Sequence, residues 1–428
     1  MPSNVYNVCA NANKRCKHQM DVLMKQQKQK PWIRFRHRVV TRLVRPFLSP
    51  YVRMSYGVKV DVFRQQRDRQ FLVLFNHQTS FDQFFVGMAM PRPVYYVATE
   101  DIFSLGWVSD LLRYVVAPIP IRKQTSDVSA IRTCIRVAKE GGTIALAPEG
   151  NRTYSGRTEY INPSIVSLIR ILKLPVALFR IEGGYGVQPR WAGKVRKGKM
   201  KAYVSQVIEP EDYADLSNDE LYARITEGLA VNENCLSGSF ESKASAEYLD
   251  RAIYVCPECG FSAFHSAGDV MTCSTCGRQV RYLPTKELQG IDWECPFRFV
   301  ADWYDHQNAF VNETDTREHT ASPLFRDQAQ VSNVIVFKRK ELLRETAGLT
   351  LYGDRVVVDE DKPDELILPF DDVSAAVCLG PNKLNIYHGD RVYQFKGDKH
   401  FNSLKYVNLF HRHQNIIKGD EHGKFLGL

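Results

Sequence analysis

The chain has 428 residues, of which 44% are apolar and 25% charged, and its formal net charge is +9. This composition excludes collagen-like, mucin-like and wholly disordered proteins, and the length predicts two to three domains. No stretch approaches the roughly 18 to 20 consecutive apolar residues that span a bilayer, and the N-terminus lacks the apolar segment of a secretory signal. We therefore expect a cytosolic protein.

The positive charge is concentrated at the N-terminus. Residues 1–60 hold 13 Lys and Arg against one acid, a net charge of +12, whereas the rest of the chain sums to −3. Between residues 32 and 51, apolar residues recur at helical spacing and arginines cluster on the opposite side. The apolar set is Trp32, Phe35, Val39, Leu43 and Phe47, and the basic set is Arg34, Arg38, Arg42 and Arg45.

This pattern predicts that residues 1–55 form a basic amphipathic segment. A basic face beside Trp and Phe suits an anionic lipid surface, so we expect peripheral binding to the inner face of the membrane. A surface helix packed on the protein core is the alternative. Pro46 and Pro50 are expected to bend or end the helix, and Arg36 falls within its apolar arc.

Residues 56–240 alternate strand-like and helix-like stretches. Continuous apolar runs at 71–75, 143–147 and 174–181 are typical of strands buried on both faces. Residues 128–139 have apolar residues at helical spacing, with Ser126 as a plausible N-cap. Strands and helices in this rhythm predict an α/β fold with a buried sheet flanked by helices.

Polar residues follow the first of these strands. His77 and Asp82 come directly after the apolar run and lead into a helix-like segment. If the turn folds back, the carboxylate accepts from one imidazole nitrogen and leaves the other free to take a proton from a hydroxyl. The alternative is a turn histidine followed by a carboxylate at a helix N-terminus.

Charged side chains also follow the next strands. Glu149, Gly150 and Arg152 lie in the turn after 143–147, and Arg122 follows a short apolar stretch. A guanidinium binds phosphate oxygens through paired donors, so both arginines are candidates for holding an anionic head group.

The order of these blocks resembles the glycerolipid acyltransferase family, which includes 1-acylglycerol-3-phosphate acyltransferases. The blocks are NHQTSFD at 76–82, PIPIR at 118–122, PEGNRT at 148–153 and LPVALFRI at 174–181, and the resemblance covers roughly residues 55–210. It departs from the usual family pattern at Pro120, Ala147 and Asn151, which leaves the acceptor open among related lysolipids.

The resemblance implies transfer of a fatty acyl group from an acyl-CoA or acyl-carrier-protein thioester to the free hydroxyl of a lysophospholipid, a step of phospholipid biosynthesis. It implies His77 as general base and Asp82 as its orienting partner. Glu149, Gly150 and Arg152 would form the acceptor-binding turn, and Arg122 would contact the phosphate. The leading acceptor is 1-acylglycerol-3-phosphate.

Paired cysteines form a separate signal at residues 250–285. Cys256 and Cys259 form one C-x-x-C pair, and Cys273 and Cys276 form another after thirteen intervening residues. Four thiolates at this spacing predict a tetrahedral zinc site without an open position, hence a structural zinc in a module that resembles a zinc ribbon. Zinc ribbons also occur in non-catalytic modules that bind nucleic acid or protein, which is the alternative function. The ribbon is not notably basic, so we do not expect nucleic acid as a partner.

The C-terminal part is expected to be rich in β structure. Residues 286–328 read as a linker region, and residues 329–428 resemble a small pleckstrin-homology (PH) or GRAM-like barrel. Alternating patterns and turn signals predict the strands, and a helix closes the chain. The expected strands lie within 332–340, 348–359, 365–370, 373–380 and 383–397, and the expected helix within 400–416.

Overall fold

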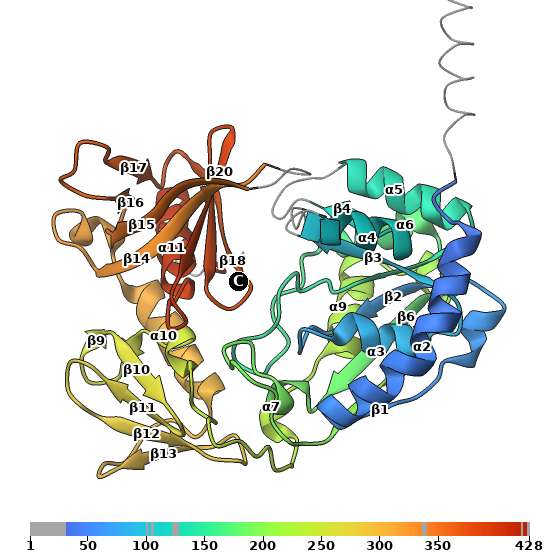
Figure 1. Ribbon diagram of the computed structural model, residues 1–428, viewed down its shortest axis with the longest axis horizontal. Helices are drawn as coiled ribbons and strands as arrows, with labels where there is room; N and C mark the ends of the chain where they lie inside the picture. The colour runs from blue at the N-terminus through green and yellow to red at the C-terminus, as the bar shows by residue number, and fades with distance from the viewer. Residues whose placement is uncertain are drawn as a thin grey trace, which may run out of the picture.

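The computed structural model describes residues 31–99, 102–103, 107–121, 128–335, 340–420 and 423–425, apart from the side chain of Val108. An α/β module lies on the right of Figure 1, and two β-rich modules lie on the left. Of the residues singled out above, Arg122, Ser126 and the first thirty positions fall outside the described ranges.

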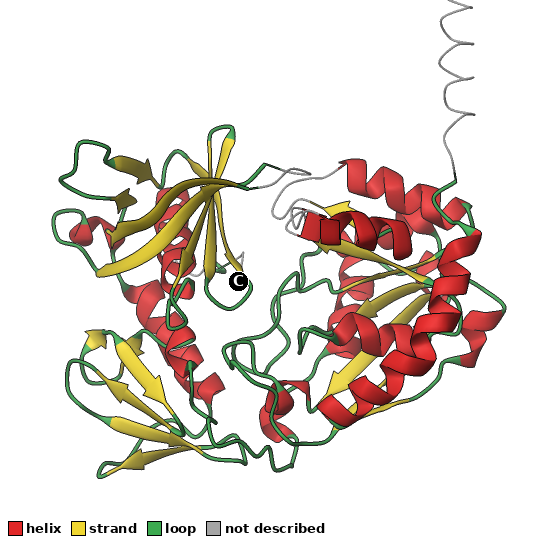
Figure 2. Cartoon of the chain, viewed as in Figure 1, coloured by secondary structure: helices red, strands yellow, loops and turns green. Residues whose placement is uncertain are grey.

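The α/β module is built on a seven-stranded sheet with the order β1-β7-β6-β2-β5-β3-β4. Its strand pairs are parallel except for β6 with β7. The strands are β1 (Val58–Val60), β2 (Leu72–Phe75), β3 (Val94–Thr99), β4 (Ile119–Ile121), β5 (Thr143–Leu146), β6 (Val176–Glu182) and β7 (Met200–Ile208). Figure 2 shows helices on both faces of this sheet, which confirms the predicted α/β fold.

The helices of this module cover two separate cores. They are α2 (Phe35–Tyr56), α3 (Asp82–Ala89), α4 (Trp107–Val115), α5 (Val128–Lys139), α6 (Ser164–Leu172), α7 (Gly184–Val187), α8 (Pro210–Ala214) and α9 (Asn218–Leu229), with a 3-10 turn η1 at Arg64–Arg67. Val73 of β2 packs with α2 and α3 on one face, and Leu72 and Leu74 pack with α5, α6 and α9 on the other. Because β2 is buried on both faces, it reads in the sequence as an uninterrupted apolar run.

Helix α2 differs from the expectation, because it continues through both prolines and ends at Tyr56. Val52 and Tyr56 are buried in the core beneath the last turns of the helix, and the Arg45 guanidinium donates to backbone carbonyls at Met88 and Met90. These tertiary contacts hold the helix where each proline removes a backbone donor. Among the described helices, none combines the length and apolar character needed to cross a bilayer.

Short antiparallel strands follow the α/β module. Two 3-10 turns, η3 (Glu233–Cys235) and η4 (Leu249–Arg251), connect the parts. The strands are β8 (Val255–Cys256), β9 (Gly260–Phe261), β10 (Phe264–Ala267), β11 (Val270–Cys273), β12 (Gln279–Tyr282) and β13 (Leu288–Ile291). The pair β8-β9 and the sheet β10-β11-β12-β13 bring the two C-x-x-C turns next to each other.

The stretch expected to be a linker, 286–328, contains ordered elements. Besides β13 it holds α10 (Val300–Glu313) and the 3-10 turn η5 (Thr316–His319). Trp303 and Val311 of α10 are buried in the core. The linker prediction is wrong here because the aromatic residues of this stretch pack into a helix between the two β-rich modules (Figure 1).

The C-terminal module has seven antiparallel strands in the order β17-β16-β15-β14-β20-β19-β18 and one closing helix. Its elements are β14 (Phe325–Asn333), β15 (Glu341–Leu351), β16 (Arg355–Val358), β17 (Leu366–Pro369), β18 (Val373–Leu379), β19 (Lys383–His388), β20 (Arg391–Gly397) and α11 (Leu404–Lys418). The first strand begins earlier than expected, because the alternating residues of 325–333 form β14, and the strand expected within 332–340 overlaps only the end of β14.

One hydrophobic core joins the β-rich modules to the α/β module. It runs from Tyr154 and Trp191 through Val280 and Trp303 to Phe410 of α11. The C-terminal half therefore shares a continuous core with the segments that follow β5 and β6 in the α/β module.

Candidate active site

The carboxyl ends of β2, β5 and β6 meet at one edge of the sheet, as parallel neighbours do. Directly after β2, the buried Asn76 side chain donates to the Ile181 carbonyl (2.9 Å) and accepts from the Ile181 N–H (2.7 Å). These two bonds imitate one further step of the β2–β6 ladder. They fix the chain at the point where it turns toward His77.

The turn after β2 brings His77 and Asp82 together. His77 Nδ1 lies 2.8 Å from Asp82 Oδ2, and Asp82 is fully buried at the start of α3. The carboxylate also accepts from the Gln78 N–H (2.6 Å), the Thr79 N–H (2.9 Å) and the Thr79 hydroxyl (2.7 Å). Four donors around one buried carboxylate hold its position and orientation.

This contact decides which imidazole nitrogen is free. Because the carboxylate accepts, the proton of neutral His77 sits on Nδ1 and the lone pair on Nε2. The His77 side chain is 25% exposed, and no described residue hydrogen-bonds to Nε2. The arrangement is that of a general base open to a reactant.

Glu149 positions the backbone of His77. Its Oε1 accepts from the His77 N–H (2.7 Å) and its Oε2 from the Glu159 N–H (2.8 Å). Burial raises the pKa of Glu149 well above its ordinary value, although both backbone donors oppose that shift. Since both oxygens already have backbone partners, Glu149 acts here by holding the turn of His77.

Arg152 lies close to this pair, two residues after the left-handed Gly150 (φ 72°). Burial and then the positive charge of Arg190 lower the pKa of Arg152 to about 10, whereas the Asp82 charge opposes that shift. The group stays protonated at neutral pH, and no carboxylate of the described residues forms an ion pair with it. A cation in this state is suited to an anionic ligand.

Two residues of this site escaped the sequence reasoning. The Gln188 Oε1 atom accepts from the Ser80 N–H (3.1 Å) and hydroxyl (2.9 Å). Arg190, 2% exposed, donates to the Arg152 carbonyl (3.0 Å) and lies over the Tyr154 ring. Both follow β6 in a stretch without strand or helix periodicity. The one sequence signal for burial of Arg190 is that Trp191 follows it directly.

The four cysteines of the two C-x-x-C turns form a second candidate site. The ligand atoms of Cys256, Cys259, Cys273 and Cys276 lie within 4.8 Å of one another, and the sulfurs of Cys256 and Cys276 are 3.8 Å apart. Four sulfurs placed tetrahedrally at a Zn–S distance of about 2.3 Å are separated by about 3.8 Å. The geometry fits a four-thiolate metal site.

Comparisons with known proteins concern the α/β module. Residues 58–181 match the family model described as Acyltransferase. A 1-acyl-sn-glycerol-3-phosphate acyltransferase of Bacillus subtilis (strain 168) is 25% identical over 163 residues, 38% of this chain and 78% of that protein. The chloroplastic 1-acyl-sn-glycerol-3-phosphate acyltransferase BAT2 of Brassica napus is 23% identical over 158 residues, 36% of this chain and 45% of that protein.

Among solved structures, the chain is similar to the 1-acyl-sn-glycerophosphate acyltransferase PlsC of Thermotoga maritima. The match has 21% identity and a TM-score of 0.39, and it covers 50% of this chain and 85% of the other. The family match at 58–181 contains His77, Asp82, Glu149 and Arg152, whereas the four cysteines lie beyond it. Residues 58–181 thus match an acyltransferase domain, and the two relatives carry the same activity in their names, so this protein is an acyltransferase.

Proposed function

We propose that the protein transfers a fatty acyl group from an acyl-CoA or acyl-carrier-protein thioester to the free hydroxyl of a lysophospholipid, with 1-acylglycerol-3-phosphate as the leading acceptor. The observation that carries this proposal is the His77–Asp82 contact beside the unpaired Arg152. Both curated relatives are named for the same acceptor, which supports the choice.

The geometry suggests how the residues act. Asp82 keeps the proton on Nδ1, so Nε2 of His77 takes the proton of the acceptor hydroxyl as its oxygen attacks the thioester carbonyl carbon. The tetrahedral intermediate then collapses, the C–S bond breaks, and the imidazolium returns the proton to the leaving thiolate. Arg152 holds the phosphate of the acceptor, so that the hydroxyl lies within reach of His77.

A transfer assay tests this proposal. Full-length protein is given a radiolabelled acyl-CoA or acyl-carrier protein and a panel of lysophospholipids, and diacyl product is measured. His77→Ala should abolish transfer, and His388→Ala, a partly exposed histidine at the end of β19, should leave it unchanged. Full transfer by a folded His77→Ala protein would refute the role of His77.

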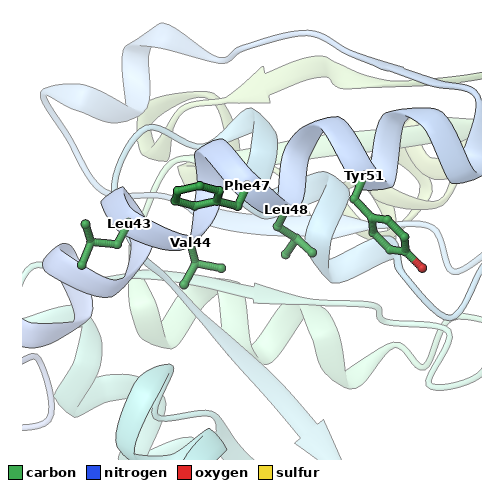
Figure 3. Close-up of a pocket in the computed structure, with 5 residues that line it drawn as sticks. All are labelled: Leu43, Val44, Phe47, Leu48 and Tyr51. Atoms are coloured by element: carbon green, nitrogen blue, oxygen red, sulfur yellow. The ribbon is translucent and has the colours of Figure 1, made fainter.

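We propose further that α2 binds an anionic membrane surface. Four residues of the predicted apolar stripe face solvent, with Phe35 80%, Val39 37%, Leu43 62% and Phe47 82% exposed. Trp32, the fifth, precedes α2 and packs against the core. Leu43, Val44, Phe47, Leu48 and Tyr51 line a shallow apolar hollow on the helix (Figure 3). Exposed Arg38 and Arg42 flank this stripe and suit lipid phosphates.

Flotation with vesicles tests this surface. Deleting residues 1–55 would also remove Val52 from the core, so the pair Leu43→Ser and Phe47→Ser is preferable. We expect the pair to lose binding to vesicles containing phosphatidylglycerol. Ile367→Ser, at a 46% exposed position of β17, is the matched control. Unchanged flotation of the double variant would refute the proposal.

We also propose that the four-cysteine site holds a structural zinc ion and that the C-terminal module is a PH- or GRAM-like barrel. Four thiolates leave no position for water, so zinc would stabilise the fold and take no part in catalysis. Metal analysis should find about one zinc per chain, lost in Cys273→Ser and kept in Cys235→Ser, whose thiol is exposed. Equal zinc in both variants would refute the site.

The seven antiparallel strands of the C-terminal module, closed by α11, support its assignment as a PH- or GRAM-like barrel.

A further inference from the structure

A cavity of about 430 Å³ lies between the α/β module, η4 and the C-terminal module. Its wall is made by residues from these three parts of the chain, and only Arg152 belongs to the acyltransferase family match. The lining residues that the following argument uses are Arg152, Gln188, Lys194, Tyr248, Arg251 and Lys399.

The cavity is strongly cationic. Arg152, Lys194, Arg251 and Lys399 line it, against Glu247 as the one acid among its lining residues. None of the four cations forms a salt bridge with a described residue. Arg251 is 4% exposed, and its described hydrogen bonds go to backbone carbonyls, including Trp191 at 2.9 Å. The charges of Asp250 and Asp398 act on Arg251 without forming an ion pair with it. Four cations that share one cavity without ion pairs suit an anionic ligand.

One wall of the cavity is held in an unusual backbone conformation. Tyr248 has φ +69°, in the left-handed region that favours glycine. Its ring packs so closely on Gly193 that a Cβ there would lie 2.6 Å away, and the Arg251 guanidinium lies 4.0 Å from the ring centre. Such conformations persist where surrounding contacts enforce them, and they cluster at ligand sites.

The C-terminal module is fixed to this wall by direct bonds. The Arg251 Nε donates to the Lys399 carbonyl, and Asp250 Oδ2 lies 2.7 Å from His400 Nδ1. The Asn402 amide donates to the Asp250 carbonyl at 2.8 Å. The backbone of Lys399 is thereby held beside Arg251 before any ligand binds, so only its exposed side chain has to be ordered on binding.

The cavity also adjoins the catalytic pair. Gln188 lines it and accepts from the N–H and hydroxyl of Ser80, three residues after His77. Arg152 lines it and is close enough to Asp82 for the two charges to interact. A reactant whose charged group is bound in the cavity could therefore place its reacting atoms at His77.

We propose that this cavity binds a phosphate ester group of a reactant and that the C-terminal module, through Lys399, completes the substrate site. The inference rests on the proposed function. Two reactants carry such a group: a lysophospholipid has it in its head group, and coenzyme A has it on its nucleotide. The phosphate chemistry is common to both, and the experiment distinguishes them.

The test uses full-length protein with Lys194→Ala and Lys399→Ala combined, both exposed positions at the rim. Loss of two charge-assisted contacts should raise the KM of the phosphate-bearing reactant by about tenfold at low salt, with kcat little changed. A rise for the lysophospholipid alone, and none for monoacylglycerol, assigns the head group. A rise for acyl-CoA alone assigns the donor.

The double variant Lys396→Ala and Lys418→Ala removes two exposed charges of the same module away from the cavity. Unchanged KM values in the rim variant, or an equal rise in this control, would overturn the proposal. Calorimetric titration with glycerol 3-phosphate and adenosine 3′,5′-bisphosphate gives a readout that does not need acyl transfer. Binding of either compound, weakened in the rim variant, would support the phosphate site even if the protein does not acylate lysophospholipids. If neither compound binds, the proposed phosphate site is wrong.

Discussion

Replacing Asp82 by Asn tests the catalytic pair with almost no change in shape. In one orientation the new NH₂ group takes the place of Oδ2 and faces the His77 ring and the Gln78 N–H. Nδ1 must then accept, which moves the proton to Nε2 and removes the base. In the other orientation the NH₂ group faces the Thr79 N–H and hydroxyl, and the carboxylate charge is lost either way.

The expected losses differ in size for activity and stability. A histidine base in the wrong tautomer costs about 10³- to 10⁴-fold in kcat, as in hydrolases with an Asp-His pair, which corresponds to roughly 4 to 5 kcal/mol of activation free energy. One buried N–H left without an acceptor lowers the free energy of unfolding by about 1 to 3 kcal/mol. The protein should remain folded and be almost inactive.

The assay compares kcat at saturating substrates with the urea unfolding curve of the same sample. Asp110→Asn, at a side chain that is 76% exposed on α4, is the matched control and should keep both values. If folded Asp82→Asn keeps its kcat within about threefold of the unmodified protein, the carboxylate does not set the tautomer of His77 and the mechanism is wrong.

Three further outcomes are expected. Arg190→Met removes the donor to the Arg152 carbonyl. If Arg190 positions Arg152 for the acceptor, the KM for the acceptor should rise about tenfold, and an unchanged KM would contradict that positioning role. Burial lowers the pKa of His411 to about 4, so its contribution to stability is present above its ordinary pKa of 6.5 and is lost as pH falls through 4. Urea unfolding at pH 7 and pH 4 measures how far the free energy of unfolding falls over this interval. This fall should be about 3 kcal/mol smaller for His411→Leu than for the unmodified protein, and an equal fall in both would exclude a buried neutral His411. Gly156→Ala meets both a left-handed backbone (φ +85°) and an aromatic ring 2.8 Å from the new Cβ, whereas Gly141→Ala meets only the backbone (φ +83°). Thermal unfolding should show Gly156→Ala about 1 to 3 kcal/mol less stable than Gly141→Ala, and equal stability would mean that the ring moves away freely.

Hydrophobic periodicity in the sequence predicted two kinds of element: helices that bury one face against the core, and strands that are buried on both faces. The strand at β2 and the helix Val128–Lys139 were found in this way, the helix with the bounds that the structure has. Helix α10 was missed although Val300, Trp303 and Val311 follow helical spacing. The buried Gln307 interrupts that stripe, because its amide bonds to backbone groups of Tyr254 and Ala252.

The polar parts of the site depended on contacts between distant segments. His77 and Asp82 are neighbours in sequence, so their contact followed from one turn. Arg190 reaches the Arg152 carbonyl from 38 residues away, and no spacing rule describes that distance. The end of helix α2 was also not predictable from local sequence. The helix continues beyond Pro50 because Val52 and Tyr56 pack against residues from other segments of the chain.

The continuous core from Trp191 to Phe410 bears on how the chain may be divided for experiments. Trp191 and Tyr154 are 0% and 1% exposed and share one core with residues beyond 250, among them Tyr282, whose ring packs edge-on against Trp191. A fragment that stops near residue 240 would lose this part of the core and expose apolar surface, which favours aggregation. Recombinant work on this enzyme should therefore keep the chain whole through α11, and grafting its catalytic part onto another protein would require a replacement lid for those two aromatic rings.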